Sequence, residues 1–128
     1  MSAKVKSTNL TDKKEIMKIT TRDDAIPMKD VTSGTEISMV AYVIEEVVKD
    51  RGIDPSREIF DCILVLTDTG ELYATRSETF INKILDIMEM LKDDEDETST
   101  DLTKEPLRIR ITQQKSRNGN NFVSCSLA

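Results

Sequence analysis

The sequence predicts a mainly β domain of five antiparallel strands, with one helix between the third and fourth strands. Two apolar stretches, residues 36–48 and 58–67, have the β-branched content of long strands. A stripe of apolar side chains at helical spacing follows them and predicts the helix. With 128 residues, of which 38% are hydrophobic, the chain can bury one modest core, so we expect a single folded domain.

The N-terminal part of the chain carries the weakest pattern. Residues 1–14 are polar, basic and without a period, which predicts a flexible basic tail before a domain over 15–128. Residues 15–20 are consistent with one short strand, and a loop containing Pro27 and Gly34 follows. The run at 36–48 also fits helical spacing, but its six β-branched residues favour a long strand.

The remaining elements are marked by turns and caps. Residues 58–67 and 71–75 flank an Asp-Thr-Gly turn, which predicts an antiparallel pair. Ser77 is the expected N-cap of a helix that ends near Leu91. Residues 107–114 and 121–127 alternate apolar and polar side chains around Asn118-Gly119, the strongest short hairpin signal. This order of elements is that of an OB-fold-like five-stranded antiparallel barrel.

Composition excludes most enzyme classes. The chain has no histidine, and its two cysteines, Cys62 and Cys125, are far apart, so neither a zinc site nor a Ser-His or Cys-His catalytic set is expected. Four glycines form no phosphate-binding loop. We expect no enzyme activity, no cofactor, no metal and no small-molecule substrate. The chain shows neither a signal core nor an apolar run long enough for a membrane, so we expect a cytoplasmic protein without a membrane partner.

The net charge of −6 is unevenly distributed. Residues 86–101 contain eight acids and one base, whereas residues 102–128 contain five bases and one acid. The acidic loop at 93–101 is read as a solvated loop, as an internal mimic of DNA that competes for a basic face, or as a tail that docks a partner. The basic C-terminal quarter removes the objection that an acidic protein would repel nucleic acid, because the local patch decides binding.

The last predicted hairpin carries the main candidates for a binding site. Arg108 and Arg110 alternate with apolar residues and share one strand face, and Lys115 and Arg117 follow at the turn. Four cations on one face and tip suit a phosphate backbone. The alternative is that the two strand arginines only keep an outer face soluble.

Aromatic side chains are the second requirement, because bases stack on them. Tyr73 lies out of phase with Leu72 and Ala74, so we expect it to face outward. Tyr42 fits the core or a DNA-facing position equally well, and Phe122 stays undecided. Phe80 is expected in the core.

Several segments resemble one protein family. They are Lys29-Asp30-Val31-Thr32-Ser33-Gly34-Thr35-Glu36-Ile37, Ala41-Tyr42, Gly70-Glu71-Leu72-Tyr73-Ala74, and the ending from Ile111 to Phe122. In order and spacing they resemble the single-stranded DNA-binding proteins of small podoviruses that copy linear genomes by protein-primed initiation. The resemblance implies an OB-like barrel that coats displaced strands during replication, with DNA contacts at Tyr42 and Tyr73. A third family tyrosine falls near Arg51, where an arginine could stack on a base or meet a phosphate.

We therefore predict sequence-independent binding of single-stranded DNA in the host-cell cytoplasm, with viral replication proteins as further partners. The alternative is an acidic protein-interaction module of a phage, such as an inhibitor that mimics DNA. The candidate DNA-binding residues are Tyr42, Arg51, Tyr73, Arg76, Arg108, Arg110, Lys115, Arg117 and Phe122.

Overall fold

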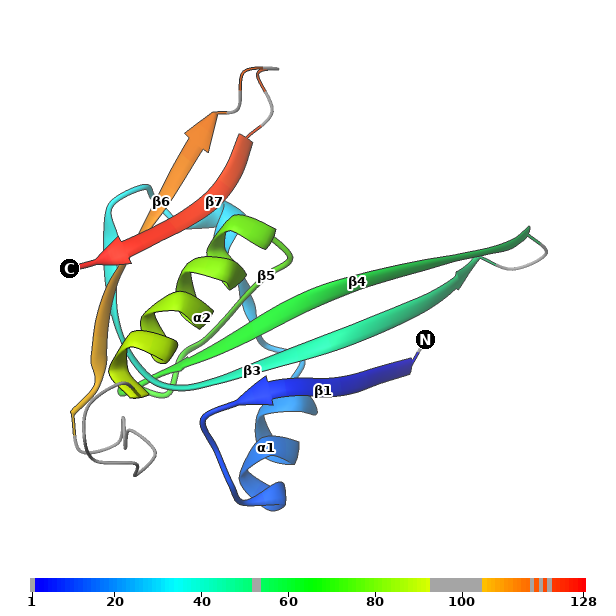
Figure 1. Ribbon diagram of the computed structural model, residues 1–128, viewed down its shortest axis with the longest axis horizontal. Coiled ribbons are helices and arrows are strands. Elements are labelled where there is room, and N and C mark those ends of the chain that lie inside the picture. Colours follow the sequence, from blue (N-terminus) through cyan, green and yellow to red (C-terminus); the bar gives the residue numbers. More distant parts are fainter. Residues whose placement is uncertain (1, 52–53, 93–104, 116, 118, 120) are drawn as a thin grey trace.

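The protein is mainly β in a computed structural model that describes residues 2–51, 54–92, 105–115, 117, 119 and 121–128. At residues 2–3, 49–51, 54–58 and 92 only the backbone is described. The described strands form one mixed, seven-stranded sheet that curls around helix α2 (Figure 1). The acidic loop at 93–101 lies outside the described residues.

The longest hairpin of the sheet joins β3 (Thr35–Arg51) to β4 (Asp54–Thr67). It extends away from the rest of the molecule as a long arm (Figure 1). β5 (Leu72–Thr75) pairs antiparallel with β4 at residues 63–66. The three strands expected from residues 36–48, 58–67 and 71–75 are therefore confirmed, and the β-branched side chains of the first outweigh its helical spacing.

The N-terminal residues are part of the sheet, so the prediction of a flexible tail over 1–14 is wrong. β1 (Ser2–Thr8) pairs antiparallel with residues 43–48 of β3, and β6 (Leu107–Lys115) pairs with residues 35–39 on the same edge. Between these two partners, the Asn9 amide donates to Val40 O (3.2 Å) and accepts the Tyr42 N–H (2.9 Å). Polar β1 is held by tertiary pairing, which its own composition does not reveal.

Residues 15–20 are helical, so the expected short strand is also wrong. They belong to α1 (Lys13–Thr20), whose N-cap Asp12 accepts the N–H of Lys14 at 2.9 Å. Ile16 and Ile19, three positions apart, share one helical face and pack under the sheet. The N-cap and this burial decide the conformation of a segment whose pattern is too short to do so.

The sheet does not close on itself among the described residues. Its order is β2-β5-β4-β3-β6-β7, and β2 (Ile26–Pro27), which the sequence does not predict, is parallel to β5. The short 3-10 helix η1 (Met28–Asp30) follows β2. β7 (Asn121–Leu127) pairs antiparallel with β6 and confirms the predicted hairpin. We call the gap between the β2–β5 end of the sheet and β7 the seam.

Helix α2 (Glu78–Lys92) fills the hollow of the curled sheet and confirms the predicted helix. The Ser77 hydroxyl accepts the Phe80 N–H at 3.3 Å, as expected of an N-cap. Phe80, Ile84 and Met88 are buried in the main core, which the inner faces of the strands complete. The main core contains Met28, Ile37, Met39, Tyr42, Ile44, Ile63, Val65, Tyr73, Phe80, Ile81, Ile84, Met88, Ile109, Ile111, Val123 and Cys125.

A second, smaller core lies on the opposite face of the sheet. It buries Ile19 of α1 against Ala41, Val43 and Leu72, and partly buried leucines surround it. Strand β5 is thus covered on both faces. Within the described part of the chain, no helix has both the length and the apolar content required to cross a membrane.

Candidate functional site

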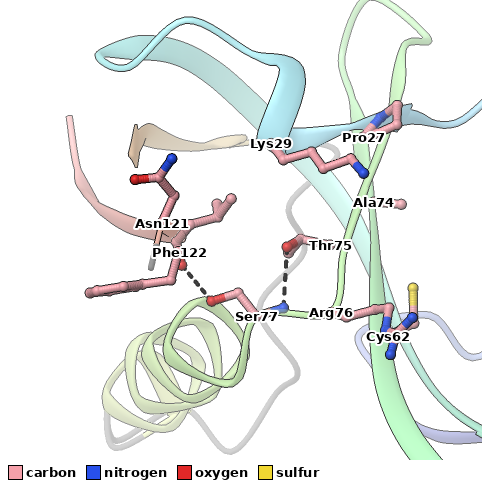
Figure 2. Close-up of a pocket in the computed structure, with 10 residues that line it drawn as sticks. Pro27, Lys29, Cys62, Ala74, Thr75, Arg76, Ser77, Asn121 and Phe122 are labelled. Carbon is pink, nitrogen blue, oxygen red and sulfur yellow. Dashed lines mark hydrogen bonds between the residues drawn. The ribbon is translucent and has the colours of Figure 1, made fainter. Parts of the chain in front are cut away.

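A pocket of about 480 Å³ lies at the seam, and we call it the seam groove. Both ends of the open sheet contribute to it, since β2 and β5 form one side and β7 forms the other (Figure 2). The groove is lined by Pro27, Lys29, Cys62, Ala74, Thr75, Arg76, Ser77, Asn121, Phe122 and Val123. Such a concave site, with apolar walls and a few polar groups, is the usual form of a binding site.

Apolar surface dominates the walls of the seam groove. Phe122 is half-buried on β7, directly opposite Gln114 of β6 in the strand register. Pro27 and Ala74, which are register partners in β2 and β5, line the other wall. Figure 2 shows the Phe122 ring pointing away from Pro27 and Ala74, so this half-buried ring lies at the edge of the groove, where it offers a flat surface on which a base could stack.

Two cationic side chains lie at the rim of the groove. Arg76 follows β5, and its guanidinium carbon lies 3.8 Å from the centroid of the Phe60 ring, a cation–π contact. Lys29 is exposed on η1. The Gln113 amide fixes that segment to β6, because its Nε2 donates to Met28 O (2.7 Å) and to Val31 O (3.0 Å).

One half-buried thiol also lines the groove. Burial raises the pKa of Cys62, the Glu45 carboxylate opposite it in the register raises it further, and the Arg76 guanidinium partly offsets this. Burial likewise raises the pKa of Glu45. In the core, burial raises the pKa of Cys125 to about 11, with Lys83 opposing the shift. Both thiols are therefore protonated at neutral pH, but Cys62 is the more accessible.

The tip of the β6–β7 hairpin places more positive charge near the groove. Lys115 pairs with Asn121, which lines the groove, and both Lys115 and Arg117 are exposed. Gly119 has a φ of 80°, a left-handed conformation that glycine adopts without strain. Of the predicted site residues, the structure brings Arg76 and Phe122 to the lining of the groove, and Lys115 and Arg117 lie farther along the β6–β7 hairpin.

The predicted arginines of β6 lie elsewhere. Arg108 and Arg110 project from the outer face of β6 opposite Ser38 and Glu36 of β3. Glu36 pairs with both, with distances of 3.5 Å from Oε1 to Arg108 Nη2 and 3.9 Å from Oε2 to Arg110 Nη2. Arg108 also lines a separate hollow, together with acidic residues such as Glu36, Asp68 and Glu71. This second cationic region is already neutralised in part.

Both predicted tyrosines are buried, and neither lines the seam groove. Tyr42 is 3% exposed and Tyr73 is 8% exposed, and both belong to the main core. The expected outward orientation of Tyr73 is wrong, because its ring points inward while Leu72 faces the second core. The Tyr73 hydroxyl donates to Glu71 Oε2 at 3.0 Å, and burial together with this contact raises its pKa. The side chain of Arg51 lies outside the described residues.

Of the ten residues that line the groove, sequence reasoning proposed only Arg76 and Phe122 as site residues, and four of those it missed carry polar groups in unremarkable sequence positions. Lys29 lies in a predicted loop, Cys62 in the middle of a strand, Asn121 at a strand start and Ser77 at a helix cap. The segment beginning at Lys29 did carry part of the family resemblance, but no periodic pattern assigns that lysine to a site. Only the curl of the sheet brings these positions together.

No protein-family model, no curated protein and no solved structure matches this chain. Among the described residues, no three His, Cys, Asp or Glu side chains are grouped so that they could hold a metal ion. The groups that the seam groove offers to a ligand are an aromatic ring, apolar walls and two cations.

Proposed function

We propose that the protein binds single-stranded DNA without sequence preference, and that the strand runs through the seam groove toward the tip of the β6–β7 hairpin. The observation that carries this proposal is the lining of the groove, which combines Phe122 of β7 with Lys29 and Arg76 across the seam and with apolar walls. Stacking platforms combined with cations are what a single strand requires. Phosphates would meet Lys29, Arg76, Lys115 and Arg117, and a base would stack on Phe122.

The strand order supports the finer assignment of the fold. We propose that β3, β4, β5, β6 and β7 are the five strands of an OB-like barrel, with α2 between the third and fourth of them. In such barrels the face of the second and third strands and the loops of the two long hairpins bind oligonucleotides. Here those hairpins are β3–β4 and β6–β7. β1, β2 and α1 would then be additions, and α1 covers part of the expected binding face.

The resemblance to podoviral single-stranded DNA-binding proteins supports a biological setting. We propose that the protein coats and protects strands displaced during viral DNA replication in the host cytoplasm, in the company of viral replication proteins. The departures from the family lie in the stacking residues. With Tyr42 and Tyr73 in the core, Phe122 takes over the stacking role in this proposal.

A salt titration tests the proposal. Fluorescence anisotropy with oligo(dT) should give an affinity that falls log-linearly with salt, with a slope of roughly −0.7 per phosphate neutralised. Oligomers of other sequence should bind with similar affinity, and a duplex of the same length should bind much more weakly. Absence of oligo(dT) binding even at low salt would overturn the proposal and favour the acidic protein-interaction module.

Thiol labelling locates the site on the molecule. An uncharged maleimide should modify Cys62 and leave Cys125 unmodified in the folded protein, because Cys125 is buried. Since burial raises the pKa of Cys62, its labelling should accelerate as the pH rises through that pKa and more thiolate forms. Saturating oligo(dT) should slow labelling of Cys62. Binding without protection of Cys62 would place the DNA elsewhere.

A further inference from the structure

Ser77 joins the two sides of the seam. Its backbone N–H donates to Thr75 Oγ1 at the end of β5 (3.2 Å), and its hydroxyl donates to the carbonyl oxygen of Val123 in β7. Figure 2 shows both interactions, with Ser77 between Thr75 and the strand that carries Phe122. The same hydroxyl accepts the Phe80 N–H as the N-cap of α2. One small side chain therefore serves a helix and a strand at once.

The register explains why Val123 needs such a partner. Val123 lies opposite Gln113 in β6, and the Gln113 N–H turns away from β7 to donate to Ser33 Oγ at 3.0 Å. In an antiparallel ladder, alternate pairs direct their backbone groups away from each other. The carbonyl of Val123 therefore points out of the sheet into the seam, where the hydroxyl of Ser77 satisfies it.

The contact fixes the geometry of the groove. Val123 directly follows Asn121 and Phe122, which form one wall, and Ser77 directly follows Arg76, which lies at the opposite rim. A bond between positions 77 and 123 sets the separation of these walls. Without it, β7 would keep its pairing with β6 on one edge but would lose this link on the other.

We infer that the Ser77 hydroxyl is a positioning group for single-stranded DNA binding, a latch that holds Phe122 and Arg76 at the separation that one strand requires. The inference rests on the proposed function of the seam groove. The latch organises the groove before DNA arrives, so its loss should weaken binding beyond any effect on the helix.

Three uncharged variants separate the latch from the helix cap. Ser77→Ala removes the latch and the cap, Ser77→Gly removes the latch but costs the helix little, and Ser77→Thr retains a hydroxyl for both. We expect Ser77→Ala and Ser77→Gly to lower oligo(dT) affinity to the same extent. The expected loss is roughly fivefold, which corresponds to the free energy of one hydrogen bond. Ser77→Thr should bind like the wild type. The thermal unfolding midpoint of Ser77→Ala should be lower than that of Ser77→Gly, because alanine is the poorer N-cap.

A matched control isolates loss of a helix cap from loss of the latch. Asp12→Ala removes the N-cap of α1, whose hydrogen bond to Lys14 lies outside the seam groove. It should lower the unfolding midpoint as Ser77→Ala does, while oligo(dT) affinity does not fall.

The possible outcomes are distinct. If affinity follows helix stability, so that Gly binds like the wild type while Ala binds weakly, the latch is overturned. The latch would also be overturned if Ser77→Ala and Ser77→Gly both bound oligo(dT) as tightly as the wild type or more tightly, or if Ser77→Thr bound it weakly. If the wild type itself fails to bind oligo(dT), the proposed function fails, which is a different result. Should Ser77→Ala fail to fold, the glycine and threonine variants still decide.

Discussion

Two cationic regions of this molecule differ in their surroundings. In the seam groove, Arg76 lies against an aromatic ring beside apolar walls, whereas on the outer face of β6, Arg108 and Arg110 share the carboxylate of Glu36. The comparison teaches that a count of cations does not locate a binding site. Of the two regions, only the seam groove joins cations to an apolar surface on which a base can stack, whereas Arg108 and Arg110 lie on an open strand face beside a carboxylate.

The largest expected effect concerns the tyrosines that sequence reasoning placed in the site. Tyr73→Ala should destabilise the fold by about 3–5 kcal/mol, the usual cost of removing a large buried aromatic side chain. Chemical denaturation monitored by circular dichroism would measure this. Tyr73→Phe, which loses only the hydrogen bond to Glu71, should cost about 1 kcal/mol and leave DNA affinity unchanged. A Tyr73→Ala variant that keeps the wild-type stability but binds DNA more weakly would contradict the burial of this ring.

The next effect tests the cations of the seam groove. The double substitution Lys29→Ala with Arg76→Ala should weaken oligo(dT) binding by about 3 kcal/mol, because two charge-assisted contacts are lost. It should also flatten the salt dependence by roughly 1.4 in slope, or 0.7 per contact. Anisotropy titrations at several salt concentrations measure both. The matched control, Lys29→Arg with Arg76→Lys, retains the charges and should retain the slope.

Phe122 separates stacking from charge. Phe122→Ala should lose roughly 1–3 kcal/mol of binding while the salt slope stays the same, because no phosphate contact is removed. Phe122→Tyr retains a ring and should bind nearly as well as the wild type. If the alanine variant binds normally, the aromatic surface of the groove does not contact bases.

How far the sequence leads can be judged from particular elements. The strands β3, β4, β6 and β7 and the helix α2 follow from apolar periodicity, because each buries a face of its own. β1 and α1 could not be predicted, because polar β1 is held by the edge of β3 and α1 by the second core. The alternation in Leu72-Tyr73-Ala74 is compatible with either face of β5 pointing to the core. Helix α1 covers the second face, so both faces are buried, and the alternation alone does not predict this.

The candidate site was predictable only in part for a related reason. Arg76 and Phe122 were expected from residue type and position, and both line the groove. Lys29 and Cys62 could not be assigned, because they reach the groove only when the sheet curls and its two ends approach each other. The pairing of Glu36 with two arginines likewise depends on the register of β3 with β6.

The smaller effects are expected on the outer face of β6. Arg110→Ala should weaken oligo(dT) binding by less than about 0.5 kcal/mol, since its partial exposure and its pairing with Glu36 leave little to lose. Measured beside Arg76→Ala at the same salt concentration, the Arg110→Ala variant tests whether the seam groove or the outer face of β6 binds the strand. An Arg110→Ala variant that loses as much affinity as Arg76→Ala would move the DNA path from the seam groove to this face.

Glu36→Gln gives the smallest expected change, and its sign is informative. The substitution removes the carboxylate that both arginines share but retains a side chain of the same shape, so the outer face of β6 gains net positive charge. A more positive surface attracts a polyanion over distances comparable to the Debye length, about 30 Å at 0.01 M salt and 8 Å at 0.15 M. Oligo(dT) affinity should therefore rise by less than about threefold at low salt and return to the wild-type value at physiological salt. Because the arginines lie outside the seam groove, this change should act on the association rate, which stopped-flow fluorescence measures, and leave dissociation unaltered. Tighter binding that persists at high salt, with slower dissociation, would mean that Arg108 and Arg110 contact DNA directly once Glu36 no longer holds them.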